Sequence, residues 1–200
     1  MKTGLFGGTF DPIHNGHLKV ALTAKNQLGL DRIIFIPSGN PPHKTDKKVT
    51  DKERRLAMTR LAVKETGALV SDWEVRQENK SYSVDLVRHF MQESPDDEFY
   101  FIIGADSFYD LPTWYHYRDL MDICRFVVIS RPDTEKSQML DLFEGTEKPP
   151  RVLFLDDLNL DISSTQIRRM LGEGKDVSHL VPKPVLDYIK NQNLYKHCNE

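Results

Sequence analysis

Five short apolar segments recur along the chain, and their residues are continuous rather than alternating with polar ones. They cover residues 4–8, 33–36, 99–103, 126–129 and 152–155, and the first is the end of a strand that begins near Lys2. Continuous apolar strands are typical of a parallel sheet covered on both faces. Residues 68–72 form a weaker candidate strand.

Helix-like segments lie between these strands. Apolar stripes at helical spacing occur at Leu18, Ala21, Leu22 and Leu28, at Ala57, Met58 and Leu61 within residues 52–65, and at Val84, Val87 and Met91. A fourth helix is expected to begin at Ser163, because Ser163 and Gln166 have capping-box spacing. A fifth is expected over about 184–191, with a proline near its first turn. Strands that alternate with helices predict βαβ units, and so a three-layer α/β domain.

Length and composition fit one globular domain over residues 1–200, with a helical C-terminal part from about residue 163. The longest apolar run has five residues, far short of the ~20 that a membrane helix needs. The first eight residues lack the apolar stretch of a secretory signal. Cys124 and Cys198 lack metal-type spacing. We expect a cytoplasmic protein with reduced thiols and no membrane association.

The formal net charge is −3, and acidic residues interrupt the one lysine cluster, at residues 44–52. This balance argues against a general nucleic-acid binder, which would show a basic stripe. Residues 37–50 and 131–151, rich in proline and polar residues, are expected to be surface loops.

The strongest chemical signal lies where the first strand ends. Gly7 and Gly8 allow close approach to the backbone, and a helix is expected to open near residue 15 or 16. The start of a helix suits phosphate, and His14 and His17 would share one face of its first turn. Zinc ligation and plain capping are the alternatives, although a zincin motif would space its histidines differently.

Two common nucleotide-binding fingerprints do not match this segment. It is not Gly-x-Gly-x-x-Gly, the signature of dinucleotide-binding dehydrogenases, and it lacks the Gly-Lys-Ser/Thr of a Walker A loop.

Residues 7–17, GGTFDPIHNGH, resemble the signature of the nucleotidylyltransferase superfamily, a His-x-x-His or His-x-Gly-His pair on a Rossmann-like fold. Within that superfamily the segment is similar to the bacterial nicotinate mononucleotide adenylyltransferases. The related pantetheine-phosphate adenylyltransferases are shorter and usually carry threonine at the position of His14. The resemblance implies a Rossmann-like α/β domain with a mainly parallel sheet and helices on both faces.

Residues 162–169, ISSTQIRR, resemble the second motif of the superfamily. Hydroxyl groups at a helix start can cap it or bind phosphate oxygens, and at least one of Arg168 and Arg169 could reach a triphosphate. The alternative is a well-capped helix with exposed arginines. The resemblance implies an ATP site made of Gly7, Gly8, Thr9, Phe10, His14, His17, Gly104, Asp106, Arg131, Ile162, Ser163, Ser164, Thr165 and Arg168.

The same resemblance implies a second nucleotide site. Its residues would be Gly8, Thr9, Lys44, Ser83, Asp106, Trp114 and Tyr115. Trp114 would stack on a nicotinate ring, and the amides of Ser83 and Tyr115 would bind its carboxylate. Ser81-Tyr82-Ser83 stands where Ser-Tyr-Thr is usual, which leaves that amide in place. The alternatives are a helix cap at Asp106, a core tryptophan, and loop roles for Lys44 and Arg131.

The reaction implied is transfer of the adenylyl group of ATP to nicotinate mononucleotide, by in-line attack and without a covalent intermediate. His14, His17, Lys44 and Arg168 would act on the phosphates, and Mg²⁺ would arrive with ATP rather than on protein side chains. Another acceptor (nicotinamide mononucleotide or phosphopantetheine), a non-catalytic nucleotide-binding module and a metallohydrolase remain as alternatives. The sequence leaves open whether the protein forms a homo-oligomer.

Overall fold

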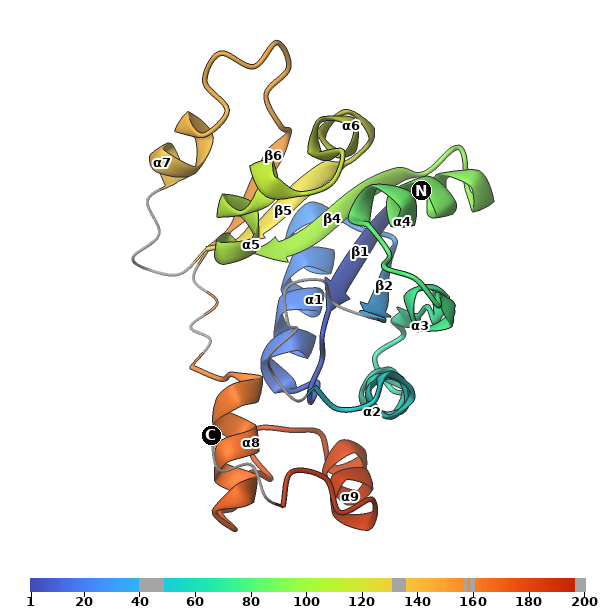
Figure 1. Ribbon diagram of the computed structural model, residues 1–200, viewed down its shortest axis with the longest axis vertical. Helices are drawn as coiled ribbons and strands as arrows, with labels where there is room; N and C mark the ends of the chain where they lie inside the picture. The colour runs from blue at the N-terminus through green and yellow to red at the C-terminus, as the bar shows by residue number, and fades with distance from the viewer. Residues whose placement is uncertain (40–48, 131–135, 157, 159–160, 197–200) are drawn as a thin grey trace.

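The computed structural model describes residues 1–39, 49–130, 136–156, 158 and 161–196. Within these residues one sheet has the strand order β3-β2-β1-β4-β5-β6, and every neighbouring pair is parallel (Figure 1). The strands are β1 (Lys2–Gly8), β2 (Arg32–Pro37), β3 (Leu69–Val70), β4 (Glu98–Gly104), β5 (Arg125–Ile129) and β6 (Val152–Leu155). The predicted parallel sheet is confirmed, with the strand order of a doubly wound Rossmann-like fold.

The helices mostly follow the predicted segments. They are α1 (Asn15–Leu28), α2 (Lys52–Val63), α3 (Trp73–Arg76), α4 (Ser83–Glu93), α5 (Ala105–Tyr109), α6 (Tyr117–Ile123), α7 (Lys136–Asp141), α8 (Ser164–Gly172) and α9 (Lys183–Asn191), with a 3-10 turn at Leu111–Thr113. Asp51 and Ser163 cap α2 and α8, because their side chains accept hydrogen bonds from main-chain N–H groups of the first turn.

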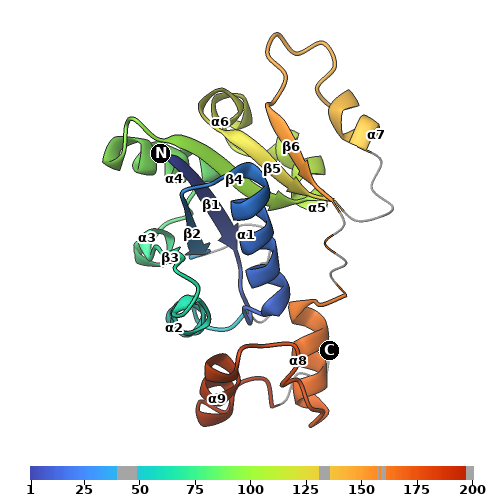
Figure 2. The ribbon, with the colours of Figure 1, turned by 180° about the vertical axis from the view of Figure 1, so that it is seen from behind.

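Each face of the sheet has its own hydrophobic core, so the fold has three layers. Phe6 and Phe35 point into a core with α1, α2 and α9, whereas Leu5 and Ile34 point into a core with α4, α5 and α6. Figures 1 and 2 show α1 on one side of the sheet and α4 and α6 on the other. Because successive strand residues face opposite layers, the middle positions of the central strands are buried on both faces, which explains their continuous apolar runs.

The C-terminal helices α8 and α9 lie at one end of the molecule, and α7 lies at the other end (Figures 1 and 2). Ile167 on α8 packs with Val177, Val181 and Leu186 in a small separate core. Val185 and Ile189 on α9 join the larger core that also contains Met58 of α2. This packing places the start of α8 near the carboxyl end of the sheet, which is where the functional residues are expected.

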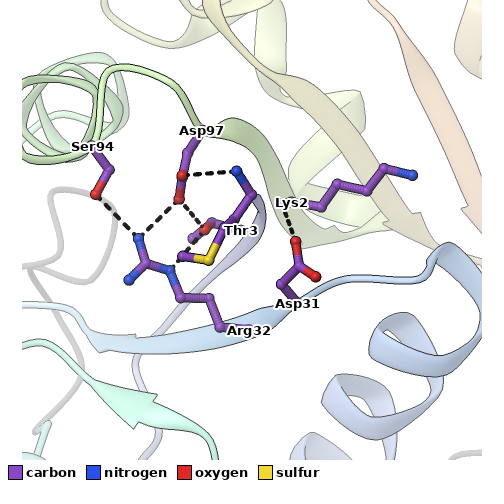
Figure 3. Close-up of polar contacts among 7 residues, drawn as sticks. Lys2, Thr3, Asp31, Arg32, Ser94 and Asp97 are labelled. Carbon is purple, nitrogen blue, oxygen red and sulfur yellow. Dashed lines mark hydrogen bonds and ion pairs between the residues drawn. The ribbon is translucent and has the colours of Figure 1, made fainter.

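A polar cluster ties the amino ends of the central strands together (Figure 3). Asp97, which precedes β4, accepts hydrogen bonds from Thr3 Oγ1 at 2.6 Å and Arg32 Nη2 at 2.9 Å, and pairs with the Met1 ammonium group at 3.0 Å. Arg32 also donates to Thr3 Oγ1 and to Ser94 Oγ. Because this cluster lies at the amino edge of the sheet, its role is to hold β1, β2 and the start of β4 in register.

Some expectations are wrong. Residues 131–151 were expected to form a loop, but Lys136–Asp141 form α7, whose Met139 is fully buried. Leu22 was expected on the buried stripe of α1, yet its side chain is 61% exposed. The short helices α3, α5 and α6 were not expected.

No helix in the described ranges combines the length and apolar character needed to cross a lipid bilayer.

Candidate active site

The strand order reverses between β1 and β4, and this is the position where Rossmann-like sheets place their ligands. The carboxyl ends of these two neighbouring strands are the glycines Gly7 and Gly8 on β1 and Gly104 on β4. All three glycines line one cavity of about 460 Å³. The two segments predicted to bind nucleotide therefore meet at one opening of the sheet.

Most residues predicted for the second nucleotide lie in this cavity. Its wall includes Gly8, Thr9, Ser83, Trp114 and Tyr115 from the predicted set, and also Ser38, Glu74, Ser81, Tyr82, Ser107 and Thr113. Asp106 does not line the cavity. It is exposed in the first turn of α5, and the next residue, Ser107, lines the cavity instead.

Aromatic side chains form one side of the cavity. The indole ring of Trp114 meets Phe101 edge to face, with 6.3 Å between ring centroids, and is only partly buried. The ring of Tyr115 lies 4.3 Å from that of Tyr82, centroid to centroid, and Tyr115 is 53% exposed. Trp114 is thus fixed by the core on one side while it contributes to the cavity wall, which suits it to stack on a flat ring.

His14 and His17 come together at the start of α1, as the sequence predicts. Their rings stack with 3.7 Å between centroids, and the main-chain N–H of His14 donates to Nδ1 of His17 at 3.2 Å. Gly16 permits this arrangement, because a Cβ atom there would lie 3.0 Å from the His14 ring. The His17 imidazole therefore accepts the main-chain N–H of the N-cap residue His14, in place of the Glu or Gln side chain usual in a capping box.

Burial keeps both imidazoles neutral. It lowers the pKa of His14 to about 4, and it lowers the pKa of His17 well below 6.5, with the neighbouring His14 adding to the effect. Since Nδ1 of His17 accepts a hydrogen bond, the proton of its neutral ring is assigned to Nε2. A neutral His17 can still donate one hydrogen bond to an anion through that nitrogen.

Phe10 was expected to contribute to ATP binding, and its side chain is committed elsewhere. Its ring is 2% exposed and packs against Phe6, Phe35 and the edge of His17. Its φ angle is +49°, a strained conformation for a residue with a side chain. Only the main chain of Phe10 can contact a nucleotide, while its ring holds His17 in place.

The start of α8 docks against the turn that precedes α1. Ser164 Oγ donates to the carbonyl oxygen of Pro12 at 2.9 Å, and Arg168 Nη1 donates to that of Asp11 at 2.8 Å. Arg168 also contacts Thr165 Oγ1 at 3.2 Å. Ile162 lies beside Gly16. The two predicted motifs, separated by about 150 residues, thus form one structural unit.

Asp11 holds the turn from inside. Its carboxylate accepts hydrogen bonds from the hydroxyl of Tyr195 at 2.6 Å and from the main-chain N–H of Thr50 at 3.1 Å, and Asp11 is 4% exposed. Burial and the nearby carboxylate raise the pKa of Tyr195 above its usual value. Both carboxylate oxygens of Asp11 therefore accept hydrogen bonds from the protein, and these bonds stabilise the turn.

Two charged residues near the site were not found from the sequence. Arg55 on α2 is 1% exposed and donates to the carbonyl oxygens of Thr9, Gly39 and Thr50. Glu74 on α3 lines the cavity, and burial raises its pKa to about 7. A signal for Arg55 existed, since it shares the helical stripe of buried Met58 and Ala62 at spacings of three and seven residues.

Lys44 and Arg131, both predicted to contact phosphates, lie outside the described residues. In the described ranges, the buried side-chain polar atoms without a hydrogen-bond partner are Nδ1 of His14 and Oγ of Ser38, and both residues border the candidate site. No group of three or more His, Cys, Asp or Glu side chains among these residues is arranged to hold a metal ion.

Comparison with known proteins agrees with this arrangement. The cytidylyltransferase-like family profile matches residues 5–170. A protein of Clostridium novyi named "Probable nicotinate-nucleotide adenylyltransferase" is 43% identical over 98% of this chain and 99% of its own length. A Geobacter sulfurreducens protein with the same name is 40% identical, with coverage of 98% and 99%.

Solved structures share the fold. The Plasmodium falciparum nicotinic acid mononucleotide adenylyltransferase complexed with NaAD superposes with a TM-score of 0.80 over the full length of both chains, at 22% identity. The same enzyme complexed with APC gives a TM-score of 0.79 over 100% of this chain and 99% of that one. Given the extent and identity of the match to its bacterial relatives, the chain belongs to the nicotinate-nucleotide adenylyltransferases of the cytidylyltransferase-like family.

Proposed function

We propose that this chain transfers the adenylyl group of ATP to nicotinate mononucleotide, giving deamido-NAD and pyrophosphate. The observation that carries the proposal is the meeting of α1 and α8 at one turn, which places His14, His17 and Arg168 together. The names of its full-length relatives support the same reaction.

The triphosphate would bind at the start of the two helices. The positive ends of the helix dipoles favour phosphate there, and Arg168 adds a full charge. The Ser163 hydroxyl caps α8 and the Ser164 hydroxyl donates to the Pro12 carbonyl oxygen, so Thr165 is the hydroxyl group of this motif that would donate to a bound phosphate. Lys44 enters the proposal from the family resemblance alone, as does Arg131.

The pyridine nucleotide would occupy the cavity. Its flat ring would stack on Trp114, and the main-chain N–H groups at Ser83 and Tyr115 would bind the carboxylate, as the family resemblance implies. These residues share one wall of a cavity of about 460 Å³, within the range of small-ligand pockets. Asp106 does not line the cavity, so its side chain would have to reach the ribose hydroxyls from beside it.

The chemistry needs alignment and charge stabilisation more than proton transfer. The attacking group is already a phosphate anion, so no general base is required. The site would hold the two phosphates in line and reduce their repulsion. As the bond to pyrophosphate breaks, charge moves onto oxygens that the His17 Nε2–H and the Arg168 guanidinium would contact. ATP would enter as its magnesium complex, as is general in this family.

A pyrophosphate-release assay with MgATP and three acceptors tests the proposal. The acceptors are nicotinate mononucleotide, nicotinamide mononucleotide and phosphopantetheine. We expect the highest kcat/KM with nicotinate mononucleotide. A higher kcat/KM with another acceptor would show that the enzyme uses that acceptor instead. ATP binding without release of pyrophosphate in the presence of any of the three acceptors would contradict the assignment as an enzyme.

A further inference from the structure

Both polar main-chain groups of Gly39, two residues beyond the end of β2, are bound by ionisable side chains. Its N–H donates to Oε2 of Glu74 at 3.3 Å, and its carbonyl oxygen accepts from Nη2 of Arg55 at 3.0 Å. A Cβ atom at this position would lie 2.2 Å from the carbonyl oxygen of Glu74. Only glycine can bring the backbone this close to α3 at this position.

Arg55 connects Gly39 to the turn between β1 and α1, which begins at Thr9. Its Nη1 donates to the carbonyl oxygen of Thr9 at 2.7 Å, and its Nε donates to that of Thr50 at 2.8 Å. The guanidinium group thus reaches three separate segments with three different nitrogens. Lysine could not reproduce this pattern, because its single ammonium group lacks the planar fork. Arg55 does not line the cavity.

Glu74 connects Gly39 to the other wall of the cavity. Ser81 adjoins Glu74 and partly offsets the rise in the pKa of its carboxyl group, and both residues line the cavity. Ser81 begins the short segment that ends in Ser83, where α4 starts. Hydrogen bonds therefore run from Glu74 through Gly39 and Arg55 to Thr9, and Ser81 adjoins Glu74 in the cavity wall.

We propose that Glu74 and Arg55 are positioning residues that fix the Ser81–Ser83 wall of the cavity relative to the Thr9 turn. This inference rests on the proposed function, since it assigns the pyridine nucleotide to the cavity and the reacting phosphates to the turn. A nucleotide that contacts both places at once binds well only when their separation is correct. Neither residue needs to touch the reacting atoms to act in this way.

The test is a double-mutant cycle with Glu74→Gln, Arg55→Lys and the combined variant. Arg54→Lys, the exposed neighbour on α2, and Glu65→Gln, an exposed glutamate, are the matched controls. For each protein the KM for nicotinate mononucleotide, the KM for ATP, kcat and the melting temperature are measured. We expect each single variant to raise the KM for nicotinate mononucleotide about tenfold, with a smaller change in kcat.

The decisive quantity is the coupling between the effects of the Glu74 and Arg55 substitutions on KM. If they act through one connected set of contacts, the double variant should be no more than a few-fold worse than the poorer single variant. An increase in KM equal to the product of the two single effects would overturn the proposal. So would an Arg55→Lys variant that melts at a lower temperature but keeps the wild-type KM, because that pattern indicates a purely structural role.

If Arg55→Lys does not fold, Gly39→Ala replaces it in the cycle. It should likewise raise the KM for nicotinate mononucleotide without adding to the effect of Glu74→Gln, and independent effects would again overturn the inference. Wild-type enzyme that releases no pyrophosphate with nicotinate mononucleotide contradicts the proposed function itself and removes the basis of the inference. Active wild type with unaffected variants contradicts the positioning role alone.

Discussion

Arg168 donates a hydrogen bond of 2.8 Å to the main-chain carbonyl oxygen of Asp11, a residue 157 positions earlier in the chain. This contact brings the second sequence motif onto the first one. It also orients the guanidinium group beside the start of α1, where the triphosphate is proposed to bind.

Replacement of Arg168 by lysine should lower kcat on the order of 10²-fold, with little change in melting temperature. The positive charge is kept, but one ammonium group cannot donate to the Asp11 carbonyl and to a phosphate with the same geometry. Steady-state pyrophosphate release measures the effect. Arg169→Lys, at the exposed neighbouring position, is the control, and equal losses in the two variants would contradict the role given to Arg168.

His17 has two separable tasks, and two substitutions distinguish them. Alanine removes both nitrogens, and we expect kcat to fall on the order of 10²-fold or more. Asparagine can place an oxygen near the position of Nδ1, and so can still accept the His14 N–H, but it has no donor at the position of Nε2. The asparagine variant should melt near the wild-type temperature and still lose turnover. Full activity in either variant would remove His17 from the mechanism.

The histidine pair should make the protein sensitive to acid. A histidine kept neutral by burial takes up its proton in the unfolded state first, near pH 6.5, and in the folded state only near pH 4 for His14. Its contribution to stability is therefore complete above pH 6.5 and is lost as the pH falls towards 4. For His14 the loss by pH 5 is about 2 kcal/mol.

Urea unfolding at pH 7 and pH 5 checks this expectation, with His14→Gln as the comparison. The free energy of unfolding of the variant should fall less between the two pH values than that of the wild type. Parallel decreases in the two proteins would show that His14 does not cause the acid sensitivity.

Trp114→Ala should raise the KM for the pyridine nucleotide roughly threefold to tenfold, while the KM for ATP changes little. The reason is the loss of a flat surface that Phe101 holds edge-on at the cavity wall. Trp114→Phe, which keeps a smaller flat ring, should lie between the wild type and Trp114→Ala. Similar increases for both substrates would argue against stacking on the pyridine ring.

The sheet could be predicted because its central strands are buried on both faces and so carry continuous apolar runs. The longer helices were predictable from their stripes for the same reason. The helices α5 and α6 have five and seven residues, too few to repeat an apolar stripe. In α7 only Met139 is buried, so the segment reads as a polar loop.

In the candidate site too, some residues could be predicted from the local sequence and others could not. His14 and His17 were predictable because their relationship is local, within one helical turn. The contact of Tyr195 with Asp11 spans 184 residues, and no local pattern indicates it. Glu74 joins the site only through the close approach of Gly39. The single domain, the cytoplasmic location and the individual roles of the site residues stay predictions, and the oligomeric state stays open.

The bond between Asp11 and Tyr195 has a consequence for biosynthesis. A ribosome delivers the amino-terminal segments first, so β1 and the turn after it emerge long before Tyr195 does. Until then one oxygen of the Asp11 carboxylate lacks the phenol that satisfies it in the finished protein. The nascent enzyme can therefore assemble most of its sheet early. The turn between β1 and α1 gains its last hydrogen bond only when almost the whole polypeptide has been made.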